Sequence, residues 1–112
     1  MTRKTFRIGK DGKIHLLENA IRGQIRDFLR QNGIYHWLNV QSPLSHKGLP
    51  DITGHFRDGS GRVFHLEVKT ERGKLSKPQI LFGERCKEDN IAYCVPRSFE
   101  DFEKWFLSIK GN

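Results

Sequence analysis

The sequence predicts an α/β fold, with a mixed central sheet flanked by helices and a further helix at the C-terminus. Apolar residues recur every three or four positions over residues 14–31 and again over 98–109, which is typical of amphipathic helices. Residues 50–57 and 62–70 flank an Asp-Gly-Ser-Gly stretch, as the strands of a hairpin do. A short apolar run, 91–95, follows a third helical segment and is typical of a buried strand parallel to its neighbour.

The chain has 112 residues, which we interpret as a single domain spanning 1–112. Its 20 Lys and Arg against 13 Asp and Glu give a net charge of +7, so a polyanionic partner such as nucleic acid is expected. No apolar run approaches the roughly 18 residues of a membrane span, and the start of the chain lacks a secretory signal. We therefore expect a cytoplasmic protein with no membrane partner. Two cysteines without a CxxC pair predict no disulfide framework.

The first helix is predicted over residues 14–31, after a basic segment in which residues 5–8 form a short strand. Asn32-Gly33 is a typical helix end. Glu18 stands three residues before Ile21 and seven before Ile25, so at 100° per residue its carboxylate lies beside the apolar stripe. Glu18 is therefore either a residue at the margin that reaches water or an acid that points at the sheet.

The next strand is predicted over residues 34–40, which are rich in aromatic and branched side chains. Two loops with basic residues lie beside the expected site, 41–49 before it and 71–75 after it. They and the following helix start supply candidates for contacts to nucleic acid, although solvated loops fit them equally well. These candidates are Ser45, His46, Lys47, Arg72, Lys74 and Lys77.

Charged residues of the hairpin are expected on one face of the sheet. Because side chains alternate along a strand, Glu67 and Lys69 share a face with His65, and the apolar residues between them take the other face. Asp51 joins that face only if the hairpin register is odd. A loop over 58–60 pairs Asp51 with Glu67, and a loop over 59–61, which suits Gly61, pairs it with Lys69. We predict an odd register or a bulge.

Two carboxylates on one face can hold a hard divalent cation such as Mg²⁺ or Mn²⁺, with water and a substrate phosphate as further ligands. In this interpretation Asp51 and Glu67 are ligands, joined by the Val68 carbonyl, and Glu18 ligates through water or a second ion. Lys69 orients the attacking water and stabilises charge on the phosphate. Taken alone, a Glu–Lys pair in a strand is an ordinary surface ion pair.

The remaining elements are two helices and the strand between them. The helix that begins at Ser76 and runs to about Glu88 has Pro in its first turn, and Gln79 fits a capping box. Strand 91–95 stops at Pro96, and Ser98 caps the last helix.

In order and spacing these segments resemble the PD-(D/E)XK nuclease superfamily. Pro50-Asp51 matches its "PD", and Glu67-Val68-Lys69 matches its "ExK". Gly48-Leu49-Pro50-Asp51 and Leu75-Ser76-Lys77-Pro78-Gln79 make the chain most similar to the VRR-NUC group. The resemblance covers residues 14–95 and implies a restriction-endonuclease-like α-β-β-β-α-β core.

The resemblance implies a metal-dependent deoxyribonuclease, an endonuclease that hydrolyses phosphodiester bonds in branched or structured DNA. It implies Asp51 and Glu67 as metal ligands, Lys69 as the catalytic lysine, Glu18 as the acid of the first helix and Gln79 as a glutamine near the active site. One departure lies in the loop before residue 48, which offers Ser-His-Lys where an arginine is expected.

Stand-alone proteins of this size in the group are typically from bacteria or phages, and they are similar to Holliday-junction resolvases in forming homodimers. We therefore expect a homodimer in the cytoplasm of a bacterial or phage-infected cell. The sequence offers two dimer surfaces, the helix 98–109 with Trp105 and the strand edge 34–40 with Trp37.

Two other functions are compatible with the sequence. One is a non-catalytic nucleic-acid-binding module on a nuclease fold, which the charge favours and the complete set of acids and lysine disfavours. The other is a zinc protein that uses His55, His65, Cys86 and Cys94, although their spacing matches no compact zinc motif.

Overall fold

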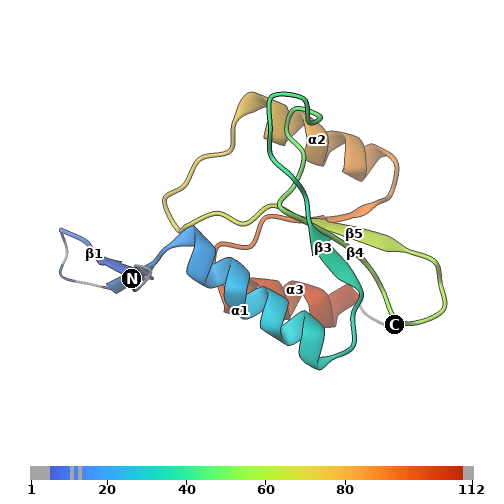
Figure 1. Ribbon diagram of the computed structural model, residues 1–112, viewed down its shortest axis with the longest axis horizontal. Coiled ribbons are helices and arrows are strands. Elements are labelled where there is room, and N and C mark those ends of the chain that lie inside the picture. Colours follow the sequence, from blue (N-terminus) through green and yellow to red (C-terminus); the bar gives the residue numbers. More distant parts are fainter. Residues whose placement is uncertain (1–5, 11, 13, 110–112) are drawn as a thin grey trace.

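A four-stranded mixed sheet lies between helices on its two faces in the computed structural model, which describes residues 6–10, 12 and 14–109 (Figure 1). The strand order is β3-β4-β5-β6, with the first two pairs antiparallel and the last pair parallel. The strands are β3 (His36–Leu38), β4 (Ile52–His55), β5 (Val63–Leu66) and β6 (Ala92–Cys94). The predicted mixed sheet, with a parallel last strand, is confirmed.

The helices form two layers around this sheet. They are α1 (Glu18–Gln31), α2 (Lys77–Glu88) and α3 (Phe99–Ile109). Figure 1 shows α2 on one side of the sheet and α1 with α3 on the other. None of the described helices is long and apolar enough to cross a membrane.

The start of the predicted first helix is a strand instead. β2 (Ile14–Leu16) pairs antiparallel with β1 (Phe6–Ile8), which confirms the short N-terminal strand. The cap residue of α1 is Leu17, whose side chain makes no hydrogen bond to the first helical N–H groups. Pairing with β1 gives the backbone N–H and C=O groups of residues 14–16 hydrogen-bond partners, as a helical turn would. The helix therefore begins only at Glu18. The helix prediction was therefore wrong over 14–17.

The core lies between the sheet and the α1–α3 layer. Ile52, Phe64 and Leu66 are fully buried on that face of the sheet, and Val68 continues the row. Against them pack the apolar stripes of the two helices, namely Ile21, Ile25 and Leu29 of α1 and Phe102 and Phe106 of α3. The opposite face of the sheet carries polar side chains, so the predicted alternation along β5 is confirmed.

The hairpin register is odd, as predicted. Thr53 pairs with His65 and Ile52 with Leu66, so the next position in line places Asp51 opposite Glu67. The alternative register, with Asp51 opposite Lys69, is wrong. The backbone bond from Phe56 N–H to the Arg62 carbonyl, 3.0 Å, continues the ladder and leaves residues 57–61 as the connection.

Candidate active site

Asp51 and Glu67 lie side by side where β4 and β5 meet, on the polar face of the sheet. Asp51 Oδ2 accepts a hydrogen bond of 2.9 Å from the backbone N–H of Val68, which fixes Asp51 against the next strand. Glu67 is 2% exposed. Burial, followed by a hydrogen bond to Asp51 and the negative charge of Asp51, raises the pKa of Glu67 to about 8. The structure thus brings the predicted carboxylate pair together.

Helix α1 adds two charged side chains to this pair. Burial raises the pKa of Glu18, and the charge of Asp51 raises it further, while Lys69 and Arg22 lower it. Arg22 Nη1 lies 3.9 Å from Asp51 Oδ1. Glu18 and Arg22 are four residues apart and so share one face of the helix. Side chains of α1, of the chain before β4 and of the chain after β5 therefore converge at one place.

A hydrogen-bonded network supports the pair from the edge of the sheet. Asn39 Nδ2 donates to Thr53 Oγ1 at 2.8 Å and to the Pro50 carbonyl at 2.9 Å. Thr53 Oγ1 shares a further bond of 2.9 Å with His65 Nδ1. The Asn39 N–H donates to the Asp51 carbonyl at 2.8 Å. These bonds hold the backbone on both sides of Asp51, and so they hold its carboxylate in place.

The Asp51–Glu67 pair fits a divalent cation, because a buried carboxylate beside another is costly unless a proton or a cation neutralises it. Mg²⁺ and similar hard ions need only one or two carboxylates. Within the described part of the chain, however, no group of three His, Cys, Asp or Glu side chains is placed to hold a metal ion. Glu18 as a ligand through water or a second ion stays a prediction. The Val68 carbonyl as a ligand stays a prediction.

Comparisons with known proteins bear on the fold. No protein-family model and no curated protein sequence matches the chain. A solved structure described as a "VRR_NUC domain" is similar, with a TM-score of 0.67 and 20% sequence identity over 82% of this chain and 95% of that chain. The chain has the fold of a VRR-NUC domain. The fold that the resemblance implied is thereby confirmed.

On this VRR-NUC fold, the predicted nucleic-acid-binding residues lie in two places. His46, Lys47 and Lys77 line one cavity between loop 41–49 and α2. Arg72 and Lys74 are exposed in loop 71–75, which follows Glu67 and Lys69 beyond the end of β5.

Ser45 and Gln79 make hydrogen bonds that stabilise the local structure. Ser45 Oγ donates to the Val40 carbonyl at 2.6 Å, within its own loop. Gln79 Oε1 accepts from the Ser76 N–H at 2.8 Å, and Ser76 Oγ accepts from the Gln79 N–H at 3.3 Å. This confirms the capping box of α2. Contacts of Ser45 to DNA and of Gln79 to the active site stay predictions.

The residues of the zinc alternative do not meet. His55 pairs with Val63 and not with His65, and its ring stacks on Tyr35 at 5.2 Å. Cys86 and Cys94 are free thiols whose pKa values are raised by burial. Among the described residues the structure forms no His–Cys metal cluster.

Two residues at the site were not foreseen from the sequence. Arg22 had a usable signal, its four-residue spacing from Glu18. Tyr93 lies opposite His65 in the β5–β6 ladder, and its buried hydroxyl has no hydrogen-bond partner among the described residues. Burial and then the charge of Glu67 raise the pKa of Tyr93. Only the pairing of β6 with β5 reveals that Tyr93 faces the site.

Proposed function

We propose that this protein is a divalent-metal-dependent endonuclease that hydrolyses DNA phosphodiester bonds in branched or otherwise structured DNA. The observation that carries the proposal is the buried, hydrogen-bonded Asp51–Glu67 pair, with charged groups of α1 and Lys69 around it, on a VRR-NUC fold. The net charge of +7 supports a polyanionic substrate.

Each residue of the cluster has a role that its position supports. Asp51 and Glu67 would hold the cation, and Asp51 is oriented for this by the Val68 N–H. The chemistry that a bound cation supplies is activation of water and neutralisation of charge on the phosphate. Lys69, whose charge acts on both Glu18 and Glu67, stabilises negative charge that develops on the phosphate. Arg22 holds Asp51 from the helix side.

The test is a cleavage panel of linear, flapped, forked and four-way DNA with Mg²⁺ or Mn²⁺. We expect the wild-type protein to cut at least one branched substrate and to lose this activity in EDTA. Asp51→Asn and Lys69→Ala should each reduce the rate by at least a hundredfold and leave DNA binding in place. Lys87→Ala, at an exposed position of α2, is the matched control and should cut normally.

Two outcomes would contradict the proposal. Undiminished cutting by both site variants would remove these residues from the chemistry. Metal-independent binding without cutting of any substrate would favour the non-catalytic binding module, which shares the fold and the charge.

A further inference from the structure

A cavity of about 570 Å³ lies beside the candidate active site and has no part in the hydrolysis described above. Loop 41–49 forms one wall, and the residues of α2 that recur every three or four positions form the other. The floor is apolar and includes Leu81, Phe82 and Ile91. Its volume lies within the range of about 300–1,000 Å³ that is usual for small-ligand sites.

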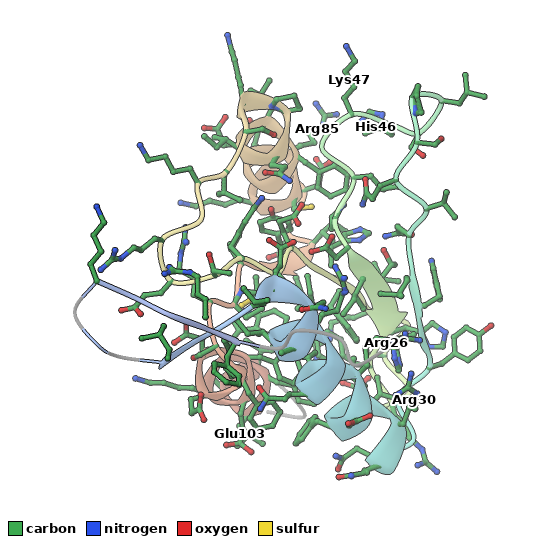
Figure 2. All side chains as sticks on the ribbon, turned by 60° about the vertical axis from the view of Figure 1, so that its left-hand side comes forward. Arg26, Arg30, His46, Lys47, Arg85 and Glu103 are labelled. Carbon is green, nitrogen blue, oxygen red and sulfur yellow. The ribbon has the colours of Figure 1, made fainter. Side chains whose placement is uncertain are left out.

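The rim of this cavity is mostly cationic. Lys47 comes from the loop, and Lys77 and Arg85 come from α2. Figure 2 shows Lys47 and His46 at the same end of the molecule as Arg85, far from Arg26 and Arg30 of α1. Asp89 also lines the cavity and accepts a hydrogen bond of 3.0 Å from Arg85 Nε. An apolar floor beside Lys47, Lys77 and the Arg85–Asp89 pair suits a ligand with an apolar part attached to negative charge.

One aromatic ring joins the cavity to the candidate active site. The centroid of the Phe82 ring lies 6.1 Å from that of His46. It lies 5.3 Å from the centroid of the His65 ring, in an edge-to-face arrangement. His65 precedes Glu67 by two residues on the same face of the strand, a distance of roughly 7 Å. Phe82 and His65 therefore stand between the cavity and the carboxylate pair.

The two walls of the cavity meet in a tight contact between Gly48 and the start of α2. Gly48 has a φ of +80°, a conformation that favours glycine. A Cβ atom at this position would collide with the carbonyl oxygen of Pro78 in α2. The close approach fixes loop 41–49 on the start of α2, so the cavity has defined walls on both sides.

We propose that this cavity receives an unpaired nucleobase of the DNA strand whose phosphate lies at Asp51 and Glu67. The base lies on the apolar floor against Phe82, and the neighbouring phosphates lie along Lys47, Lys77 and Arg85. A nucleotide combines the aromatic plane and the anionic backbone that this floor and rim match, and base–aromatic stacking tolerates any base. The inference rests on the proposed function and narrows its substrate to DNA with an unpaired nucleotide beside the scissile phosphate.

The experiment measures binding in EDTA, where no cutting takes place, by fluorescence anisotropy of labelled forked DNA. The first unpaired nucleotides of each arm are replaced, one at a time, by abasic residues that keep the backbone charge. We expect one position at which loss of the base weakens binding by about tenfold, as stacking on an aromatic side chain allows. Leu81→Trp, which fills the cavity, should remove this difference. Ile80→Trp, at the neighbouring exposed position outside the cavity, should retain it.

Equal affinity of the wild-type protein for all forks would overturn the inference, and this comparison needs no variant to fold. A change of oligomeric state in Leu81→Trp, without a change in base dependence, would assign the cavity to a contact between copies and overturn it as well. Base-dependent binding without cutting in Mg²⁺ would support the cavity and refute the nuclease. Cutting without base dependence would support the nuclease and refute the cavity.

Discussion

At the Asp51–Glu67 pair, the requirements of folding and of the proposed chemistry oppose each other. Glu67 has a raised pKa of about 8 in the folded protein against an ordinary value of 4.5. Below pH 4.5 Glu67 is protonated in both states, and no stability is lost. Between pH 4.5 and 8 the unfolded chain releases this proton while the folded protein holds it, so stability falls as the pH rises. Above pH 8 the loss is complete.

We therefore expect Glu67→Gln to stabilise the metal-free protein by roughly 1–3 kcal/mol at pH 8.5 and by little at pH 4.5, because one pKa unit corresponds to about 1.4 kcal/mol. Urea unfolding at the two pH values in EDTA measures this difference. Mg²⁺ should raise the stability of the wild-type protein and leave that of Glu67→Gln unchanged. Glu103→Gln, on α3, is the control. A variant that is less stable than wild type at pH 8.5 would contradict the prediction.

Tyr93 is a second single residue that lowers the stability of the fold. Its ring lies against Gly83 of α2, where an added Cβ would stand 2.8 Å from Tyr93 Cε1, and its hydroxyl has no partner among the described residues. A buried hydroxyl without a hydrogen bond costs about 1–3 kcal/mol. Tyr93→Phe should therefore stabilise the protein by about 1 kcal/mol in chemical denaturation.

Tyr35→Phe is the matched control for Tyr93→Phe, because Tyr35 is 66% exposed and its hydroxyl is not buried. We expect no change in stability for this control. A loss of stability in Tyr93→Phe would mean that the Tyr93 hydroxyl is hydrogen-bonded in solution.

At the scale of elements, the contact between loop 41–49 and α2 depends on Gly48. Alanine there meets two penalties, a left-handed backbone and a collision with the Pro78 carbonyl. Gly59 has a similar φ of +76° and nothing within 4 Å of the added Cβ, so Gly59→Ala isolates the backbone penalty. We expect the free energy of unfolding, measured in urea, to fall by about 1 kcal/mol in Gly59→Ala and by roughly 2–4 kcal/mol in Gly48→Ala. Equal losses of stability in the two variants would show that loop 41–49 shifts to accommodate the added Cβ without further cost.

Elements whose signals are local were predictable from the sequence. The capping box of α2 needs only residues 76–79, and the alternation along β5 needs only its own side chains. Residues 14–16 show where local reasoning fails, because their apolar spacing also fits a helix and their partner strand, β1, lies outside any local window. The hairpin register was narrowed to two choices, and the wrong one was favoured by the suitability of Gly61 for a positive φ. Gly61 does have a φ of +77°, but within a longer connection.

The site combines local and tertiary information in the same way. Strand parity was enough to predict that Asp51, Glu67 and Lys69 share a face, whereas the spacing of Glu18 left open whether its carboxylate reaches water or points at the sheet. The four-residue spacing from Glu18 places Arg22 on the same helix face, but its contact with Asp51 depends on how α1 packs. The burial of Tyr93 depends on how β6 pairs with β5. The cavity beside α2 was equally hidden, because it requires loop 41–49 to fold back onto a helix about 30 residues later in the chain.

At the scale of the whole molecule, the sheet has one apolar and one polar face, and its first strand is exposed. β3 stands at an edge of the described sheet. Apolar side chains along it and beside it remain in solvent, with Tyr35 at 66%, Leu38 at 42% and Val40 at 75% exposure. An exposed edge with apolar side chains is a typical site of pairing between chains. Trp105, on the other surface considered, packs against Phe102 and Phe106 instead.

We therefore predict a homodimer that forms through the β3 edge. Sedimentation equilibrium should show a dimer for the wild-type protein. Val40→Lys should weaken self-association at least tenfold. In a symmetric dimer each copy would place its lysine either against the same lysine of the other copy or against an apolar side chain, and both contacts are unfavourable. Leu107→Lys is the matched control, since Leu107 is 58% exposed on α3, the other surface considered. Dissociation by Leu107→Lys alone would move the interface to α3. A monomeric wild-type protein would contradict dimer formation itself, and a branched substrate would then have to be engaged by one copy of the site.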